Sequence, residues 1–573
     1  LAKLDSAPMR EELERAFADN NDDYGRKLYL IENCLYGVDI QPIAIQITKL
    51  RFFISLVCDQ KTNRNKKDNH GIRPLPNLET KFVAANSLIG LPEMDQMELV
   101  DPRVYKIEAE IETLYHSHFS IQRRDQKIAV QGKVKALRKE MAHLLAQSLM
   151  SRKKSEHIAE WDPFDPQSSA DFFDPHWMFG RTLEKGFDLV IANPPYGRIV
   201  GGRDEEAIAS RWPEFKTTRD AFVAFVLLGL KLNRDNATIA FIIPTAWLGG
   251  PSYSTFRATL LRKAIEEVVV LPFDMFTEAY VDTLILRVTN RPPAQNQVVR
   301  TFTYPKRTDV SVFSPGPWEL IPADDWRRMP DNKFLLSEAG VAMTKTLREN
   351  CKRTFASLVE MRRGVLFDKT LLSDKKAGPK SHPYFEGDVY RYHLNRNTPS
   401  WVEYGPKMKE YPKEFRWFEG KRLLLRRLVN RRQRLMATIA EDTFITNKNL
   451  YTLLEKPASE PLKVTLALLN SKLVSRLYIE AVSQATKDDF PQVTITDLLN
   501  LPVPSRIPVE GRARLVELAD QMLTRKREEA DADAAALEKE IDALVYQLYG
   551  LSPDEINLVE SALAEPQQRQ AIP

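Results

Sequence analysis

The chain has 573 residues, of which 43% are hydrophobic and 28% are charged, and its formal net charge is only +4. This length predicts two to four domains, and the composition is that of a globular protein rather than of a disordered or membrane-spanning chain. No run approaches 18 consecutive apolar residues, which predicts a cytoplasmic protein. The three cysteines are far apart in the sequence, so we expect them to form neither a disulfide framework nor a metal site.

Two short strands and several helices are predicted in the first 160 residues. A helix over residues 10–31 leads into a strand at 34–38, and aliphatic residues at helical spacing predict a second helix over 42–58. Another apolar run predicts a strand over 81–85. The long, charged, glycine-poor stretch at about 101–161 predicts an inserted helical hairpin with a structural role.

Strands and helices alternate again up to about residue 290, which predicts a doubly wound α/β sheet. The predicted strands are 187–192, 237–243, 267–271 and 283–288, with a helix over 220–232. Beyond this point the alternation stops. We expect domain boundaries that separate residues 1–290, a proline-rich linker at 291–345, a mixed α/β region at 346–505 and a helical segment at 506–573.

The sharpest chemical signal is the loop Asn193-Pro194-Pro195-Tyr196, which directly follows the apolar strand at 187–192. Ligands of open α/β sheets bind at the carboxyl ends of the strands. The Asn193 side-chain carbonyl and the Pro194 backbone carbonyl can each accept a hydrogen of an exocyclic amine, which frees the nitrogen lone pair for attack on a methyl sulfonium. Pro194 and Pro195 restrict the loop, and Tyr196 offers a flat face for a base. The loop therefore predicts methyl transfer to an amine, and the alternative is a structural proline turn.

This loop and three other segments carry a resemblance to a known family. The segments are Leu35–Pro42, Phe172–Phe179, Phe187–Tyr196 and Phe490–Thr496. The chain resembles the gamma-class adenine-N6 DNA methyltransferases of bacterial restriction–modification and phage-exclusion systems. The resemblance implies a Rossmann-like methyltransferase sheet with a helical insertion, then a mixed α/β target-recognition domain and C-terminal helices. It also implies S-adenosyl-L-methionine as cofactor, double-stranded DNA as substrate, and subunits of a restriction or defence system as further partners.

The resemblance places the cofactor-binding residues at two strand ends. Asp39, with Ile40 beside it, would bind the ribose hydroxyls of S-adenosylmethionine, and the alternative is a helix N-cap. Asn86 and Ser87 stand where the family commonly has an aspartate, so the charge is lost here. The family's glycine loop is missing, because the 22 glycines include no G-x-G pair. We expect that the natural protein extends upstream or that this piece is incomplete, and that the piece alone binds the cofactor weakly.

Phe276 matches the family's aromatic residue that packs against the target adenine. Because the adenine amine is paired inside a duplex, this match implies that the base is flipped out and held between Tyr196 and Phe276. The alternative is that Phe276 is an ordinary core residue.

Residues 346–505 resemble the family's target-recognition domain. The stretch Lys421–Arg434 has seven basic residues in fourteen and no acid, which predicts phosphate contacts, with a solvated helix face as the alternative. Asn447 and Lys448 could read base edges. The predicted DNA-binding residues are Lys421, Arg422, Arg426, Arg427, Arg431, Arg432, Arg434, Asn447 and Lys448.

Three rival functions remain open at this stage. Methyltransferases that act on a protein glutamine or on ribosomal RNA share the Asn-Pro-Pro-Tyr loop, but they are usually compact. A DNA-binding specificity piece that is inactive without upstream sequence would have no use for that loop. The chain could also be the methylase and specificity portion of a bifunctional restriction enzyme, although no convincing P-D…E-x-K carboxylate set for cleavage occurs in it.

Overall fold

The computed structural model divides into two compact units. The first comprises Leu1–Ile243 and Leu286–Pro292, and the second comprises Pro244–Ile285 and Pro293–Pro573. The structure describes residues 23–90, 101–147, 158, 160–180, 183, 185–272, 275–276, 281–305, 308, 313–385, 387–396, 400–429, 434–481 and 492–563.

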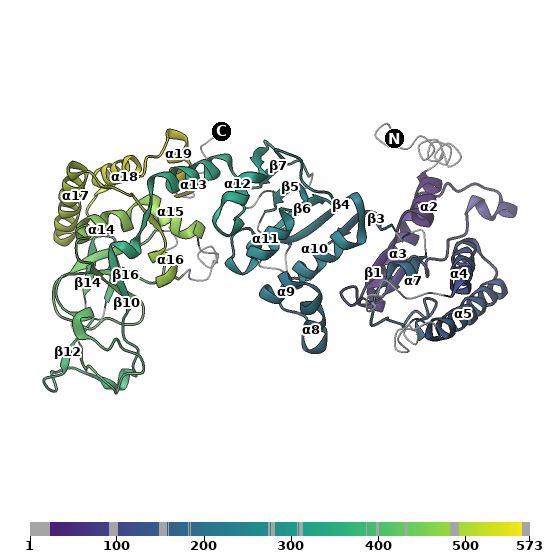
Figure 1. The fold of residues 1–573 in the computed structure, drawn as a ribbon, viewed down its shortest axis with the longest axis horizontal. Helices are drawn as coiled ribbons and strands as arrows, with labels where there is room; N and C mark the ends of the chain where they lie inside the picture. Colours follow the sequence, from purple (N-terminus) through teal and green to yellow (C-terminus); the bar gives the residue numbers. More distant parts are fainter. Residues whose placement is uncertain are drawn as a thin grey trace. The chain divides into compact units, whose positions relative to one another are not determined.

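The first unit opens with alternating helices and strands (Figure 1). These elements are α2 (Asp23–Asn33), β1 (Gly37–Asp39), α3 (Pro42–Cys58) and β2 (Phe82–Ala84). Proline begins α3, since its missing N–H is not needed at that position. Strands β1 and β2 pair in parallel, with Asp39 opposite Ala84. The predicted helix over 42–58 is therefore confirmed, and both predicted strands are present but shorter.

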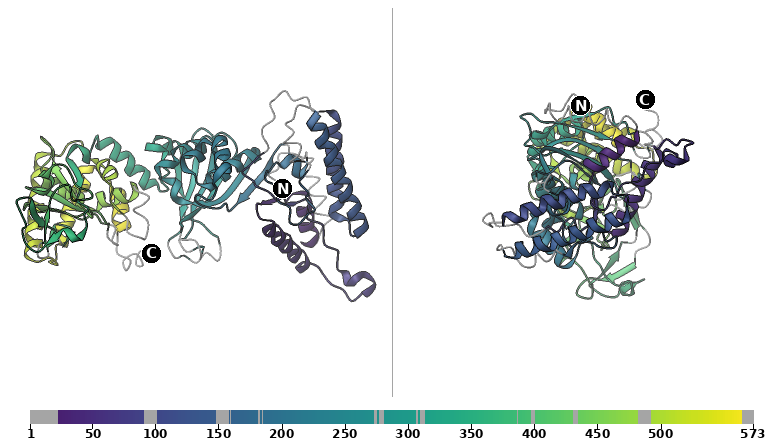
Figure 2. Two further views of the ribbon diagram at one scale, coloured as in Figure 1. Left: turned by 90° about the horizontal axis from the view of Figure 1, so that it is seen from below. Right: turned by 90° about the vertical axis from the view of Figure 1, so that its right-hand side faces the viewer.

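A pair of long helices follows, α4 (Pro102–Ser120) and α5 (Arg124–Gln147). The two helices lie side by side (Figure 2) and share an apolar core that includes Val104, Ile111 and Met141. This arrangement confirms the predicted helical hairpin. The apolar positions of both helices are used in the contact between them, in agreement with a structural role.

The rest of the first unit surrounds strand β3 (Phe187–Ala192). Its other elements are α7 (Pro175–Phe179), α8 (Gly202–Arg211), α9 (Pro213–Thr218), α10 (Ala221–Leu232) and β4 (Asn233–Pro244). Strands β3 and β4 pair in parallel, with Ala192 opposite Phe241. Helix α10 is hydrophobic on almost every side and nearly all of it is buried, as expected for a helix in a crossover between parallel strands.

The α/β sheet differs from the expectation of one continuous sheet. Strands β1 and β2 form a two-stranded sheet of their own, and a second sheet has the order β3-β4-β6-β5-β7-β8. Leu189 and Ile191 of β3 are 56% and 71% exposed, although strands of parallel sheets are normally covered on both faces. A mixed α/β architecture is confirmed, and the described strands divide it into two sheets.

Residues 291–345 are not the linker that their prolines predicted. The helices and strands from α11 to α13 are α11 (Ser254–Leu260), β5 (Ala264–Val270), β6 (Thr283–Thr289), β7 (Val298–Thr303), β8 (Glu319–Pro322), α12 (Ala323–Arg328) and α13 (Glu338–Asn350). Strand β7 pairs in parallel with β5 and antiparallel with β8. Because the prolines stand outside β7 and only at the end of β8, they do not interrupt the ladder.

The mixed region has a four-stranded antiparallel sheet of order β10-β18-β16-β17. Its strands are β10 (Val359–Arg363), β16 (Arg422–Arg426), β17 (Ala437–Ala440) and β18 (Leu450–Glu455). Smaller pairings use β9 (Arg353–Thr354), β11 (Leu372–Ser373), β12 (Ser381–Tyr384), β13 (Gly387–Tyr390), β14 (His393–Arg396), β15 (Ser400–Glu403) and β19 (Pro502–Val503).

Helices pack against this sheet and close the second unit. They are α14 (Leu462–Asn470), α15 (Lys472–Ala481), α16 (Ile495–Leu499), α17 (Val509–Glu528), α18 (Ala535–Tyr549) and α19 (Pro553–Leu563). Leu423 and Leu425 of β16 face the same large core as α14, α17 and α18, whereas Leu424 faces a second core. The predicted C-terminal helices are confirmed. Among the described residues, no helix combines the length and the apolar character needed to cross a bilayer.

Candidate functional site: a loop at the end of a parallel strand

The Asn193–Tyr196 loop begins where β3 ends. Asn193 is exposed at the carboxyl end of the strand, whereas Pro194 is buried and fixes the next peptide. The Tyr196 hydroxyl lies 2.7 Å from Asn193 Oδ1 and 3.3 Å from the Ile242 carbonyl oxygen of β4. The amide oxygen of Asn193 therefore already occupies the position of a hydrogen-bond acceptor, and the tyrosine hydroxyl donates to it.

The Tyr196 side chain is a donor and not a base. Partial burial raises the pKa of its phenol above the ordinary value of 10.0, because desolvation disfavours the phenolate. The phenol therefore stays protonated at neutral pH. What the loop can do chemically is accept hydrogens from an amine at Asn193 Oδ1 and present the Tyr196 ring.

Residues that the sequence did not single out hold this loop in place. Gly197 adopts a φ of 81°, which favours glycine, and its N–H donates to Asp220 Oδ1 at 2.8 Å. The Gly197 carbonyl accepts from the Ala221 N–H at 3.1 Å. Asp220 thus ties the loop to the first turn of α10. The sequence predicted only a helix over 220–232, which gave no signal for a contact between Asp220 and the loop.

A buried carboxylate holds the segment after the loop. Glu205 of α8 is 7% exposed and forms ion pairs with Arg198 at 3.0 Å and Arg219 at 3.3 Å. Two cations compensate one buried acid, which removes most of the cost of burying it. Glu205 therefore connects the two ends of the chain segment between the Asn193 loop and α10.

Asp39 is the last residue of β1, and Ile40 follows it. The Asp39 carboxylate is exposed, and its Oδ1 accepts from the Gln41 N–H at 2.8 Å. The N-cap of α3 is Gln41 and not Asp39, so the alternative reading of Asp39 as the helix cap is not what the structure has. Asp39 Oδ2 has no hydrogen bond to a described residue, and an exposed carboxylate oxygen of this kind suits a ribose hydroxyl.

Asn86 and Ser87 lie after β2, next to the end of β1 in the parallel pair. Asn86 Nδ2 donates to Asp204 Oδ2 of α8 at 3.3 Å, and Asn86 Oδ1 accepts from the Leu88 N–H at 3.3 Å. The structure therefore brings Asn86 to the segment that follows the Asn193 loop. Ser87 is half-buried. The donor set at these strand ends fits the nucleoside part of S-adenosylmethionine, whereas no glycine loop is present for its methionine part.

Phe276 is half-buried and follows β5 in the second unit, whereas Tyr196 belongs to the first unit. The structure therefore leaves their pairing around a flipped base as a prediction.

Among its described residues, the basic stretch Lys421–Arg434 contains no helix. Residues Arg422–Arg426 form β16, and Lys421 before them is exposed. Arg422 is fully buried and donates to the carbonyls of Gly420 and Asp442 at 2.8 Å each. Its predicted phosphate contact is therefore wrong, because the strand turns this side chain into the protein.

Arg434 is corrected in the same way. It is 9% exposed and donates to the Asn470 carbonyl at 2.6 Å. Arg426 pairs with Asp388 at 2.8 Å, and half-buried Arg427 bonds to Gln492. Arg431 and Arg432 lie outside the described residues.

Asn447 and Lys448 lie in the turn before β18. Lys448 is exposed, and Asn447 is half-buried with its Oδ1 bound to the Asn449 N–H at 2.8 Å. The Lys448 carbonyl accepts from Arg363 Nε of β10 at 3.0 Å. The two predicted base-reading residues therefore stand beside the end of β10.

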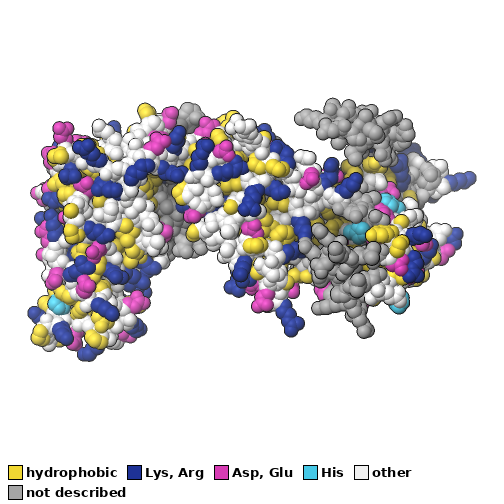
Figure 3. Space-filling model, viewed as in Figure 1, with side chains coloured by type: hydrophobic (Ala, Val, Ile, Leu, Met, Phe, Trp, Pro, Cys, Tyr) yellow, Lys and Arg dark blue, Asp and Glu magenta, His cyan; other side chains and the backbone are white. Residues whose placement is uncertain are grey.

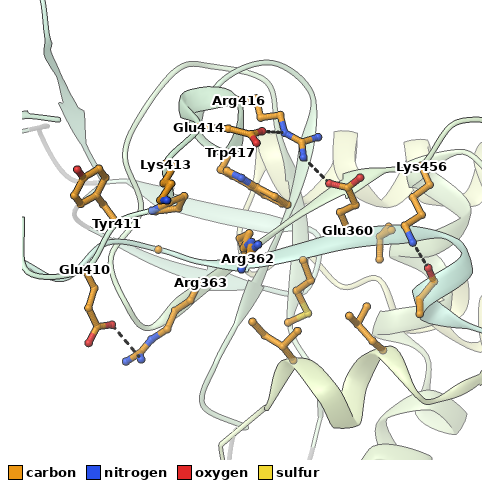
Figure 4. A pocket seen from close by; sticks show the side chains of 17 residues that line it. Glu360, Arg362, Arg363, Glu410, Tyr411, Lys413, Glu414, Arg416, Trp417 and Lys456 are labelled. Atoms are coloured by element: carbon orange, nitrogen blue, oxygen red, sulfur yellow. Dashed lines mark hydrogen bonds and ion pairs between the residues drawn. The ribbon is translucent and has the colours of Figure 1, made fainter. Parts of the chain in front are cut away.

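Residues near the end of β10 line an open groove of about 760 Å³ (Figure 4). One wall is β10 itself and the other is the segment 410–417, with buried Trp417 among the lining residues. Segment 410–417 is held by paired hydrogen bonds between Leu366 and Glu410, at 2.8 and 3.0 Å. The sequence gives no signal for this groove, because β10 and the segment 410–417 each supply only two of its basic residues and lie about 50 residues apart in the chain.

Two regions of the chain match families of known proteins. Residues 33–276 match the model described as Eco57I restriction-modification methylase, and residues 382–503 match the TaqI-like C-terminal specificity domain. The chain thus contains a restriction–modification methylase domain followed by a specificity domain.

Individual relatives agree with this composition. The chain is 30% identical over 593 residues to RM.MjaORFECS2P of Methanocaldococcus jannaschii, which bears the name of a type II restriction enzyme and methyltransferase; the match covers 92% of this chain and 49% of that protein. It is 28% identical over 184 residues to the type II methyltransferase M.TthHB8I of Thermus thermophilus, covering 30% of this chain and 39% of that one. The chain spans about half the length or less of these curated relatives.

A solved structure shares the fold. The type IIL restriction-modification enzyme MmeI, solved in complex with DNA, superposes with a TM-score of 0.50 at 13% identity, covering 98% of this chain and 77% of MmeI. At this identity the likeness concerns the fold alone.

Proposed function

We propose that this chain transfers a methyl group from S-adenosylmethionine to the N6 amine of an adenine in duplex DNA, at a sequence chosen by residues 346–505. The observation that supports it most is the position of Asn193 Oδ1, an exposed acceptor at the end of β3, in a chain whose first domain matches a restriction–modification methylase. A binding module would have no use for such an acceptor.

The loop's own residues orient the amine. Asn193 Oδ1 and the Pro194 carbonyl each accept one amine hydrogen, which turns the nitrogen lone pair away from the base. The Tyr196 hydroxyl must then exchange its bond to Asn193 for the one it can make to Ile242, at 3.3 Å. Asp220 and Glu205 hold the loop during this exchange. No strong base is needed in this scheme, in keeping with the protonated state of Tyr196.

The cofactor would be held at the ends of β1 and β2 of a Rossmann-like methyltransferase domain. The Asp39 carboxylate is positioned to accept hydroxyl hydrogens of a ribose, and Asn86 with Ser87 would border the adenine ring. S-adenosylmethionine supplies a methyl group on a positively charged sulfur. The Asp39 carboxylate also places a negative charge at the carboxyl end of β1.

The second candidate is a part of a bifunctional enzyme. RM.MjaORFECS2P is named for both restriction and methylation, and this chain covers 49% of it. We propose that the chain is the methylase and specificity portion of such an enzyme, in which case other polypeptide segments or subunits of a restriction or defence system would cleave DNA.

The test is the identity of the methylated base. The full natural gene product is incubated with duplex DNA and labelled S-adenosylmethionine, and the DNA is digested to nucleosides. We expect the label in N6-methyladenine and at one recurring sequence. Label in N4-methylcytosine would keep amine methylation but refute the adenine assignment, and label in added RNA or protein alone would refute DNA as the substrate.

We further expect that the target adenine leaves the duplex and lies between Tyr196 and Phe276. Stacking on two aromatic faces would offset part of the few kcal/mol lost on unstacking. A duplex with 2-aminopurine at the target position should brighten when the natural gene product binds, and Phe276→Ala should weaken both the brightening and methyl transfer. Normal methylation without a change in fluorescence, unaffected by Phe276→Ala, would instead identify Phe276 as a core residue.

A further inference from the structure

The groove beside β10 has an excess of positive charge that its own carboxylates do not neutralise. Five lining residues are basic and three are acidic. The basic residues are Arg362, Arg363, Lys413, Arg416 and Lys456, and the acidic residues are Glu360, Glu410 and Glu414. Every one of the three carboxylates is already paired with an arginine of the groove.

Two arginines form the ion pairs with all three carboxylates (Figure 4). Arg416 pairs with Glu414 at 2.5 Å and with Glu360 at 2.7 Å, and Arg363 pairs with Glu410 at 3.7 Å. Bonds to both carboxylates, that to Glu414 first, raise the pKa of Arg416. These two arginines and three glutamates therefore form an ion-paired frame around the groove with a formal charge of −1.

Three cations of the groove are left over, and one of them, Lys456, donates to the Ala356 carbonyl at 2.7 Å. The other two are Arg362 and Lys413. Both are exposed, and neither has an ion pair with a described residue. Arg362 stands on β10 with its guanidinium 5.9 Å from the centre of the Trp417 ring, which limits its motion without neutralising it. Lys413 reaches the groove from the opposite wall.

We propose that the specificity domain binds duplex DNA in this groove, where Arg362 and Lys413 contact phosphates of the DNA backbone. This inference rests on the proposed function and replaces Arg422 and Arg434 as the source of those contacts. One cation from each wall of the groove could then neutralise two phosphates of the DNA backbone. Arg363 and Arg416 would first have to break an ion pair with a glutamate before they could bind a phosphate.

The surroundings of the groove favour DNA over a small anion. Arg363, which lines the groove, donates to the Lys448 carbonyl, and the neighbouring Asn447 pairs with Val365 just beyond β10. A duplex whose backbone lies in the groove would therefore meet polar side chains suited to base edges at the same end. Figure 3 shows basic and acidic side chains interspersed over the visible surface. The groove is therefore identified by its cations without an ion pair, and not by a large basic patch on that surface.

The test compares Arg362→Gln and Lys413→Gln, singly and together, in the full natural gene product. Each removes one phosphate contact, so near 0.15 M salt each should weaken binding of every duplex about fivefold, and the slope of log affinity against log salt should fall by about 0.9. The double variant should lose about 25- to 30-fold in affinity. Lys539→Gln on α18, an exposed lysine outside the groove, is the matched control and should bind as the parent does.

The outcomes separate this proposal from the proposed function. Unchanged affinity and slope in the double variant, in a protein that methylates DNA, would overturn the groove and leave the methyltransferase. Weaker binding with the expected slopes, in a protein that transfers no methyl group to DNA, would support the groove and overturn the enzyme. A parent protein without measurable affinity for any duplex would overturn both.

Discussion

Asn193→Ala is expected to lower kcat for methyl transfer about 100- to 1,000-fold, which corresponds to roughly 3–4 kcal/mol of barrier. The reason is that Asn193 Oδ1 is the side-chain acceptor that would hold the amine when its nitrogen becomes nucleophilic. Duplex affinity should change little, because the residue touches only the reacting group. Methyl incorporation at saturating DNA and saturating cofactor measures the effect, and a binding assay on the same protein measures affinity.

The control for this experiment is Gln126→Ala, which removes an exposed amide from helix α5 and should leave kcat unchanged. Tyr196→Phe is informative beside it, since it deletes the hydroxyl 2.7 Å from Asn193 Oδ1 and keeps the ring. Parental turnover with alanine at position 193 would show that the loop is structural and would remove the main support for the proposed chemistry.

Arg434→Ala is expected to destabilise the second unit by about 1–3 kcal/mol, the usual effect of removing one partner of a buried hydrogen bond. Arg434 is 9% exposed and bonds to the Asn470 carbonyl, and Asn470 Oδ1 in turn accepts from the Ala437 N–H of β17 at 2.9 Å. Arg426→Ala, in the same basic stretch but half-exposed, should cost at most about 1 kcal/mol. Hydrogen exchange at the Ala437 amide and the denaturation midpoint report both effects.

The pH dependence of the Arg434→Ala effect follows from Asp542. Burial raises the pKa of the Asp542 carboxyl above the ordinary 3.8, and attraction to Arg434 is the largest influence that lowers it again. With a raised folded-state pKa, the carboxyl favours folding below pH 3.8, and that contribution is lost as the pH rises through the folded pKa. The destabilisation by Arg434→Ala should therefore be largest at neutral pH and shrink as Asp542 becomes protonated. Unchanged stability with reduced DNA affinity would restore Arg434 as a phosphate contact.

Local features of the chain could be predicted because they depend on near neighbours in sequence. The helix over 42–58 follows from its apolar spacing and its initial proline, and the strand at 187–192 follows from an unbroken apolar run. The Asn193 loop was predictable together with its place, because a strand end and two prolines restrict the backbone locally. The same holds for the two long helices at 102–120 and 124–147, whose apolar positions already required a partner.

Only the tertiary structure decided which charged residues face solvent and which hold the site. Arg422 and Arg434 looked like phosphate contacts, but β16 and the core beneath it bury them, and their hydrogen bonds go to backbone carbonyls. Arg362 and Lys413 share a groove although 51 positions separate them in the chain. Likewise, the Asp220 side chain accepts from the Gly197 N–H of the loop and makes no capping hydrogen bond to its own helix. The sequence gives the charge of each side chain, but contacts between distant segments of the chain determine its partners. Those partners in turn determine whether the charge is available to bind DNA.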